Sequence, residues 1–136
     1  MASLSLTSAF ARYGAKLANP QWAVSAINSE GELVVSCWKH YLKGSGGRLF
    51  YKDRLSRWDG NSAGNNLLRE HLEKAVAGEL PVRLVVARTD ATDIVDSGQD
   101  ASQAPKTFGV REDLIGKVVA FGGDYFEIEF VREAGA

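Results

Sequence analysis

The chain has 136 residues, of which 45% are hydrophobic and 24% charged, and its formal net charge is −1 at pH 7. This length and composition predict a single globular domain over residues 1–136. The expected core is large enough to be stable without disulfides or a structural metal ion. Cys37 is the sole cysteine, which excludes an intramolecular disulfide and is typical of a reducing compartment.

The N-terminal region predicts a helix over residues 6–17 rather than a signal peptide. Its apolar residues recur on one face of a 3.6-residue period, at Leu6, Phe10, Tyr13 and Leu17. Thr7 or Ser8 is the expected N-cap, and Pro20 ends the helix because the residue before a proline disfavours helical backbone. No apolar stretch in the chain approaches the ~20 residues of a membrane helix. We therefore expect a cytoplasmic protein with no membrane partner.

The next part of the chain predicts three strands. Over residues 22–27 the side chains of Trp22, Val24 and Ala26 alternate with those of Ala23, Ser25 and Ile27. Turn-forming residues follow at 28–31, and residues 33–38 return as the second strand of a hairpin. Residues 39–47 predict a loop or a frayed strand end, and residues 48–52 predict a short strand. The sequence KGSGGR in this region lacks the spacing of a phosphate-binding loop, so we interpret it as a flexible hairpin connection.

The strongest predicted helix covers residues 65–78. Asn65 or Asn66 is the expected N-cap, and Gly78 is typical of the position just past a helix C-terminus. The expected buried stripe of this helix contains Leu67, Leu68, Leu72, Ala75 and Val76. Residues 81–88 follow as a strand, which we place at the centre of the sheet because its apolar residues are consecutive.

The C-terminal third predicts an acidic loop followed by three strands. Residues 89–104 carry four aspartates and no base, and we expect a loop with one helical turn near residues 97–103. A short strand is expected over residues 106–113, and a hairpin with a glycine-rich turn over residues 116–132.

This order of elements predicts an α+β domain. Because two hairpins are expected, the sheet is predicted to be mostly antiparallel, and strongly twisted or barrel-like. We expect five to seven strands with two helices packed against them. No internal repeat, linker or low-complexity tract divides the chain.

No motif in the sequence identifies a reaction, a metal site or a cofactor, so we expect no cofactor and no metal. Cys37 and His40 are three residues apart, which on a strand places them on opposite faces. Cys37 lies among apolar strand residues, where cysteine behaves as a small hydrophobic side chain. His71 is expected on a helix surface with its ring partly packed. The aspartates of residues 89–104 lack the ligand spacing of an EF-hand.

Basic and aromatic residues are interleaved in the middle of the chain. The bases are Lys39, Lys43, Arg48, Lys52, Arg54 and Arg57, against the single acid Asp53. The aromatic residues among them are Trp38, Tyr41, Phe50, Tyr51 and Trp58. Lysine and arginine neutralise phosphates, and flat side chains stack on unpaired bases. Phe50 and Tyr51 are neighbours on a predicted strand, so at most one of them faces outward, and Trp38 is expected in the core.

These residues lead to our first hypothesis, a non-catalytic nucleic-acid-binding module. Its candidate contact residues are Lys43, Arg48, Lys52, Arg54, Arg57, Trp58, Asn61 and Asn65. Trp58 is expected to stack on a base, the asparagines to contact base edges, and the helix N-terminus at Asn65 to accept a phosphate. The second hypothesis is a protein-interaction or inhibitor module that uses the same surface or a sheet edge, and the third is a small enzyme built on Cys37 and His40.

Overall fold

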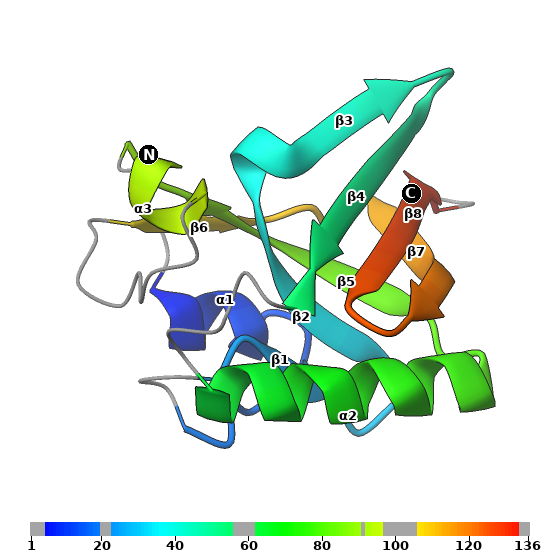
Figure 1. The fold of residues 1–136 in the computed structure, drawn as a ribbon. Helices are drawn as coiled ribbons and strands as arrows, with labels where there is room; N and C mark the ends of the chain where they lie inside the picture. The colour runs from blue at the N-terminus through cyan, green and yellow to red at the C-terminus, as the bar shows by residue number, and fades with distance from the viewer. Residues whose placement is uncertain (1–4, 20–22, 56–61, 91, 97–105, 134–136) are drawn as a thin grey trace.

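The computed structural model describes residues 5–19, 23–55, 62–90, 92–96 and 106–133, whose arrangement is shown in Figure 1. The helical elements are α1 (Leu6–Ala11), the 3₁₀ helix η1 (Lys39–Tyr41), α2 (Ser62–Gly78) and α3 (Thr92–Asp96). The strands are β1 (Ser25–Ile27), β2 (Leu33–Trp38), β3 (Leu42–Ser45), β4 (Arg48–Arg54), β5 (Val82–Arg88), β6 (Thr107–Val110), β7 (Leu114–Gly122) and β8 (Tyr125–Arg132).

The predicted α+β architecture with a mostly antiparallel sheet is confirmed. Seven strands follow one another in the order β1-β2-β5-β7-β8-β4-β3, and β6 adds an eighth by pairing with β5. Every strand pair in the described part of the chain is antiparallel except β2 with β5. The main path reaches the upper limit of the predicted strand number, and β6 exceeds it. Because β1 and β3 are the two ends of this path, the described sheet is open, and the predicted barrel-like closure is not confirmed.

The centre of the sheet is covered on both faces. β2 is buried at every position, and its residues from Leu33 to Val35 belong alternately to two core clusters. Leu33, Val35 and Cys37 belong to the cluster that includes the buried side chains of α2. Val34 belongs to the second cluster, together with Phe10 of α1. The helices α1 and α2 therefore lie on opposite faces of the central strands. Each large apolar side chain that is fully buried in these clusters contributes roughly 1.5–3 kcal/mol to the free energy of unfolding.

One face of α2 packs against β1, β2 and β7. Leu68, Leu72 and Ala75 are buried there, as their spacing predicts. Leu67 packs at the edge of the second cluster. Val76 is 48% exposed, so its predicted burial is wrong. The reason is geometric, because eight residues beyond Leu68 an α-helix has turned by roughly 80° away from the buried direction.

The two ends of α2 differ from the predicted ends. The helix begins at Ser62, so Asn65 lies inside it and the predicted N-cap is wrong. Gly78 is the last helical residue rather than the residue after it. Glu79 follows with a φ of 50°, the left-handed conformation that commonly ends a helix.

α1 is shorter than predicted and ends at Ala11. Gly14 takes a left-handed φ of 69°, which turns the chain away before the last apolar residue of the predicted stripe. The N-cap is Ser5, whose side chain accepts the backbone N–H of Ser8 at 3.1 Å, so the predicted cap at Thr7 or Ser8 is displaced.

The predicted hairpin formed by β1 and β2 is confirmed. Val35 pairs with Ser25, and the connection is built on Asn28. The Asn28 Oδ1 atom accepts the backbone N–H groups of Glu30 and Glu32 at 3.0 and 2.9 Å. Such side-chain-to-backbone bonds are the physical reason that asparagine favours turns.

The segment predicted as a loop or frayed strand end forms β3, which pairs with β4. The connecting residues Gly46 and Gly47 have φ angles of 59° and 80°. Two successive left-handed residues are the requirement of a type I′ hairpin turn, which glycine meets without steric strain. The interpretation of KGSGGR as a hairpin connection is therefore confirmed.

The C-terminal hairpin is also confirmed, as β7 and β8. Phe126, Ile128 and Phe130 of β8 are fully buried, and the residues between them are not, as the period of two predicts. β7 begins at Leu114, before the predicted start of the hairpin, and contains a β-bulge between Val118 and Ala120.

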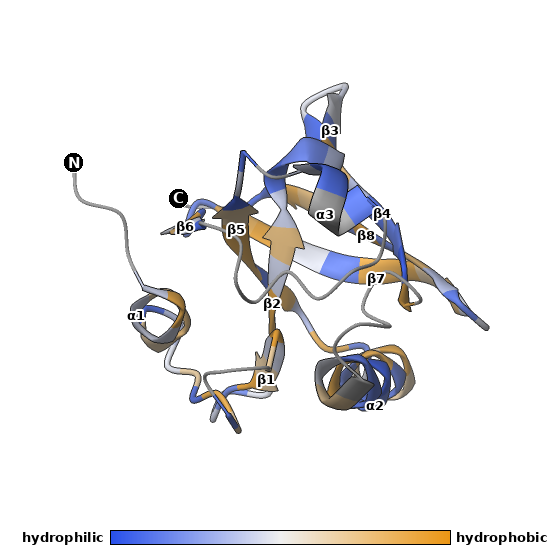
Figure 2. Cartoon of the chain, turned by 60° about the vertical axis from the view of Figure 1, so that its left-hand side comes forward, coloured by the Kyte–Doolittle hydropathy of each residue, from blue (hydrophilic) through white to orange (hydrophobic). Residues whose placement is uncertain are grey.

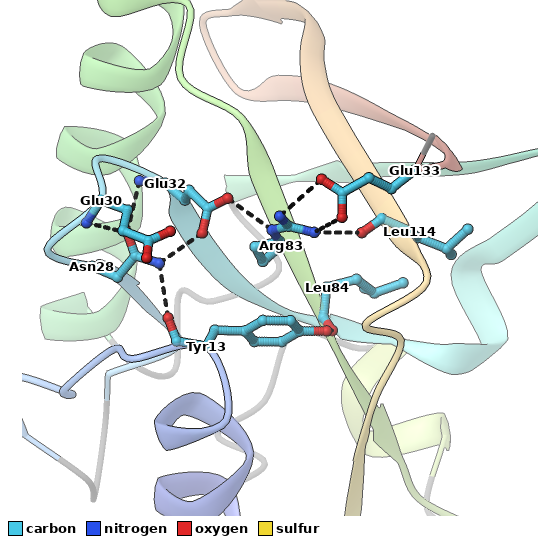
Figure 3. Close-up of polar contacts among 8 residues, drawn as sticks. All are labelled: Tyr13, Asn28, Glu30, Glu32, Arg83, Leu84, Leu114 and Glu133. Atoms are coloured by element: carbon cyan, nitrogen blue, oxygen red, sulfur yellow. Dashed lines mark hydrogen bonds and ion pairs between the residues drawn. The ribbon is translucent and has the colours of Figure 1, made fainter. Parts of the chain in front are cut away.

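An arginine-centred network joins three distant parts of the chain (Figure 3). The Arg83 Nε atom donates to Glu32 at 2.9 Å, and both terminal nitrogens donate to Glu133 at 3.1 Å. Arg83 also donates to the carbonyl of Leu114 at 3.2 Å, and Asn28 donates to Glu32 at 2.9 Å. The hydrogen bonds with Glu133 and Glu32 raise the pKa of Arg83. The network thereby ties the β1–β2 turn to β5 and to the end of β8.

Tyr13 fastens the segment after α1 to the same region (Figure 3). Its hydroxyl donates to the carbonyl of Leu84 at 2.7 Å and accepts the backbone N–H of Arg111 at 3.1 Å. Its own carbonyl accepts from Asn28 at 2.8 Å. Burial raises the pKa of Tyr13 to about 12, so the hydroxyl retains the proton that it donates.

The acidic segment contains a short helix, α3, over Thr92–Asp96. The helical turn predicted near residues 97–103 lies outside the described residues. The predicted short strand that follows is confirmed as β6, which pairs with β5. Within the described ranges, no helix combines the length and the apolar character that a membrane crossing requires.

Candidate functional site

The two faces of β4 have different chemical character. Tyr51 and Asp53 are buried on the core side of the strand. Lys52 and Arg54 are exposed, and Phe50 is partly buried on their side of the strand. The expectation that at most one of Phe50 and Tyr51 faces outward is thus met, with Phe50 as the outward residue.

The neighbouring strand β3 extends this outer face. Lys43 is directly opposite Phe50, and Ser45 is directly opposite Arg48. Opposite residues of an antiparallel pair lie on the same face of the sheet. We define the hairpin face by these outward residues of β3 and β4: Lys43, Ser45, Arg48, Phe50, Lys52 and Arg54. Four of the predicted contact residues, all of them bases, therefore lie on one surface.

The hairpin face is set apart from α2. In Figure 1 the β3–β4 hairpin extends away from α2, which runs along the opposite side of the molecule. In Figure 2 the end of this hairpin is coloured mainly hydrophilic, whereas β2 and β5 are mainly hydrophobic. The burial pattern agrees, because β3 is exposed at three of its four positions.

A pocket of about 480 Å³ opens on the hairpin face. Its lining residues come from η1, β3, β4 and β8 and are Tyr41, Lys43, Ser45, Phe50, Lys52 and Glu127. Lys43 and Lys52 form no ion pair or hydrogen bond through their side chains within the described part of the chain. The pocket therefore combines two available ammonium groups with two aromatic rings.

Tyr41, which lines the pocket, forms a hydrogen bond with the acidic segment. The Tyr41 hydroxyl donates to Asp96 of α3, and the His40 Nε2 atom lies 3.1 Å from the same carboxylate oxygen. The rings of His40 and Tyr41 are in contact, with centroids 4.2 Å apart. One of the aspartates of residues 89–104 thus orients an aromatic wall of the pocket.

Two carboxylates of β8 adjoin the hairpin face. Glu129 accepts from Arg48 at 2.8 Å, so the Arg48 guanidinium group already has an ion-pair partner. Glu127 is directly opposite Lys52 and lines the pocket. The Tyr125 hydroxyl donates to the Glu127 Oε1 atom at 2.8 Å, which orients the carboxylate. The hairpin face is basic, with one acceptor group placed inside the pocket.

The remaining predicted contact residues do not all join this surface. Arg57, Trp58 and Asn61 lie outside the described residues. Asn65 lies in α2, where its Nδ2 atom donates to the carbonyl of Leu55 at 2.8 Å, and it does not line the pocket. Because α2 begins at Ser62, the N-terminal amides expected at Asn65 belong to earlier residues.

Some residues of the site were absent from the predicted set. Tyr41 and Phe50 were noted in the sequence only as part of the aromatic pattern, and Ser45 and Glu127 carried no signal. The alternation along β4 places Phe50 beside the predicted bases and is the signal that identifies it. Glu127 comes from a strand more than seventy residues away, and only the register of β4 with β8 reveals it.

A buried polar pair supports the hairpin from its core side. The Tyr51 hydroxyl donates to Asp53 at 2.6 Å and accepts the backbone N–H of Trp38 at 3.4 Å. The backbone N–H of Arg54 donates to the other Asp53 oxygen at 2.8 Å. Burial, together with the nearby Asp53 charge, holds the pKa of Tyr51 well above its usual value, so the phenol stays a donor. Trp38 is buried, as predicted.

Cys37 lies inside the protein core, and His71 is packed against it. Cys37 is fully buried, and burial raises the pKa of its thiol, so the reactive thiolate is disfavoured. His71 is partly packed, as predicted, and its Nδ1 atom lies 2.7 Å from the Oγ atom of Ser25. Ser25 is fully buried and cannot meet a substrate. Among the described residues, no group of three metal-binding side chains gathers at one point.

Within the described ranges, the hairpin face with its pocket has the chemistry of a binding site. Comparison with known protein families, curated proteins and solved structures finds no match to this chain.

Proposed function

We propose that the chain is a non-catalytic nucleic-acid-binding module whose contact surface is the hairpin face. The observation that carries the proposal is the pocket, in which Lys43 and Lys52 border the rings of Tyr41 and Phe50. Lysine side chains neutralise phosphates and release their counterions, and an aromatic face stacks on a base with roughly 1–3 kcal/mol per stack. One small surface therefore supplies both kinds of contact.

The charge distribution supports the same role. The chain is nearly neutral as a whole, yet the exposed charged side chains of β3 and β4 are all basic, and the only acid in these strands, Asp53, is buried. Arg48 and Arg54 stand at the two ends of β4, which separates them by roughly 20 Å of extended backbone. A linear row of lysine and arginine side chains of this length can contact several successive phosphates of a polynucleotide.

Phe50 takes the stacking role in this proposal that the sequence suggested for Trp58. Trp58, Arg57 and Asn61 stay candidates for further contacts, because they follow β4 closely in the chain. Trp58→Ala is then expected to weaken oligonucleotide binding without a comparable fall in melting temperature. An equal loss of stability would instead assign Trp58 to the core.

The proposal is tested by the fluorescence anisotropy of a labelled single-stranded oligonucleotide. The double variant Lys43→Gln/Lys52→Gln is expected to lower its affinity roughly tenfold or more, because two phosphate contacts are lost. The matched control is Lys16→Gln/Lys74→Gln, which changes the net charge equally at exposed positions outside the pocket. Equal losses in the two double variants would mean that only net charge matters, and the hairpin face would lose its assigned role.

One observation favours the second candidate, a protein-interaction module. β3 is the last strand of the sheet path, so its outer edge is open among the described strands. An extended segment of another protein can add to such an edge. Recovery from a lysate of one acidic protein with no nucleic acid would favour this candidate over the first.

A further inference from the structure

We infer that the pocket selects a guanine base presented by single-stranded nucleic acid, with Glu127 as the residue that determines this specificity. The inference rests on the proposed function and extends it to the ligand class. The guiding observation is that the pocket of about 480 Å³ is lined by the carboxylate of Glu127 in addition to its lysines and aromatic rings. A carboxylate repels phosphates and accepts hydrogen bonds, so in this pocket it suits a ligand group that carries N–H donors.

Glu127 is prepared as an acceptor. The Tyr125 hydroxyl donates to its Oε1 atom at 2.8 Å and fixes its direction. This hydrogen bond is also the main reason that the pKa of Tyr125 is raised, which keeps the phenol protonated. A carboxylate offers about four lone-pair directions, so Glu127 retains acceptors on both oxygens after this bond.

Lys52 completes the recognition pattern. It is directly opposite Glu127 in the β4–β8 ladder, so a donor and a pair of acceptors lie side by side on the hairpin face. The Watson–Crick edge of guanine has the complementary order, with the O6 acceptor followed by the N1–H and N2–H donors. The Lys52 ammonium group has three N–H donors, so it can donate to O6 as well as to a phosphate of the same strand. The two oxygens of Glu127 accept from N1–H and N2–H.

The other bases do not complete this pattern. Adenine and cytosine each place a ring-nitrogen acceptor beside their amino group, and that acceptor faces a carboxylate oxygen. Thymine and uracil have a single N–H between two carbonyl groups, so one of these carbonyls faces the second oxygen. A base edge paired with the wrong group leaves a desolvated acceptor without a partner, which is the usual origin of specificity.

The structure also favours a single strand over a duplex. In a duplex the Watson–Crick edges are already paired and the base faces are stacked, so neither Glu127 nor Phe50 reaches its contact. An unpaired base has both its edge and its face available. Phe50 lies between Lys43 on β3 and Lys52 farther along β4, so a base stacked on it has ammonium groups on both sides.

The experiment measures anisotropy with short oligothymidines that carry guanine, adenine, cytosine or thymine at the central position. The wild-type protein is expected to bind the guanine strand about fivefold or more tightly than the others. Glu127→Gln is expected to remove this preference, even if the lost negative charge raises the affinity for every strand. The matched control Glu129→Gln loses the same charge outside the pocket and is expected to keep the preference.

The outcomes separate this inference from the proposed function. Equal binding of all four strands by the wild type would overturn the guanine assignment while leaving nucleic-acid binding intact. No binding to any strand would overturn both. Competition by guanosine monophosphate as effective as that by the unlabelled guanine strand, or equal binding of the paired duplex, would overturn the assignment to a single strand.

Discussion

Phe50 and Tyr51 are adjacent in β4 and face opposite sides of the sheet. Phe50 lines the pocket, whereas Tyr51 is fully buried beneath it. We predict that Phe50→Ala weakens binding to a single-stranded oligonucleotide by roughly 1–3 kcal/mol, because a stacking surface is lost. Anisotropy titration measures this change, and urea denaturation is expected to show a smaller effect on the free energy of unfolding.

Tyr51→Phe is predicted to have the opposite profile. The missing hydroxyl removes one donor to Asp53, which keeps the backbone N–H of Arg54, and it removes the acceptor of the Trp38 backbone N–H. The free energy of unfolding is expected to fall by about 1–3 kcal/mol, with oligonucleotide affinity unchanged under conditions where the variant is folded. If Tyr51→Phe weakened binding as much as Phe50→Ala, the assignment of the two faces would be contradicted.

His71 predicts a pH dependence of stability. Burial is the main cause that lowers its pKa below the usual value of 6.5. The His71 imidazole is therefore protonated at a higher pH in the unfolded chain than in the folded protein. The contribution of the neutral His71 ring to the free energy of unfolding is complete above pH 6.5. It is lost as the pH falls through 6.5 toward the folded-state pKa.

The measurement is the free energy of unfolding of the wild type and of His71→Gln between about pH 8 and pH 5. The wild type is expected to lose stability more steeply below pH 6.5 than the variant, which lacks the titrating ring. The difference between the two proteins isolates His71 from other groups. A slope in the variant as steep as in the wild type would contradict the assignment.

The sequence predicted one part of the site well, namely the placement of bases along a strand. The period of two places Arg48, Lys52 and Arg54 on the same side as Phe50, and this requires only local geometry. Tyr41 and Glu127 could not be found in this way. Their contribution depends on how η1 and β8 lie beside β4, which is a long-range property of the sheet.

At the scale of elements, the β7–β8 hairpin depends on a glycine. A Cβ atom on Gly116 would lie 2.5 Å from the ring of Phe130 and 2.8 Å from the carbonyl of Glu129. Gly116→Ala is therefore expected to reduce the free energy of unfolding by about 1–3 kcal/mol, the usual effect of overpacking a core. Urea denaturation measures the change.

Gly122 provides the matched control in the same strand. A Cβ atom there would meet nothing within 4 Å, and its φ is not left-handed. Gly122→Ala is expected to change stability much less than Gly116→Ala. Similar losses at the two positions would mean that chain flexibility, rather than the contact with Phe130, explains the need for glycine.

Strands that show alternation and are followed by turn residues could be predicted from the sequence, but the residues at which they begin and end could be predicted less well. The hairpins β1–β2 and β7–β8 follow from alternation and from turn residues such as Asn28. At β3 the sequence predicts only a loop or frayed strand end, because these four residues contain a glycine, a serine and only one apolar side chain. It is held as a strand by pairing with β4, and the two glycines of the turn permit that pairing.

At the scale of the whole molecule, Arg83 connects segments that are distant in sequence. It pairs with Glu32 and Glu133, and all three side chains are largely or partly buried. Arg83→Met is predicted to lower the free energy of unfolding by on the order of 3 kcal/mol, because two carboxylates lose their partner. Thermal and urea denaturation measure the loss.

The comparison variant is Arg48→Met, which breaks the ion pair with Glu129 on the hairpin face. Arg48 is 57% exposed, and exposed ion pairs contribute about 0–1 kcal/mol. The two variants are thus expected to differ clearly in stability. A loss at Arg48 as large as that at Arg83 would contradict the view that the Arg83 network holds the fold together.

The topology of the whole sheet was the least predictable feature. β2 and β5 pair in parallel, although the hairpin β3–β4 and the helix α2 lie between them in sequence. Their consecutive apolar residues indicated a central, doubly covered position for β5 but not the identity of its neighbours. The order of the sheet places β3 and β4 at the end opposite β1, and this leaves the hairpin face open.

We propose that Lys43 and Lys52 of the hairpin face contact phosphates. The most direct test is the salt dependence of the affinity for a single-stranded oligonucleotide, in the wild type and in Lys43→Gln/Lys52→Gln. We predict that the slope of log K against log salt becomes less negative by about 1.4 in the double variant, because each phosphate contact contributes about 0.7. Binding with the same affinity and the same slope in both proteins would contradict the claim.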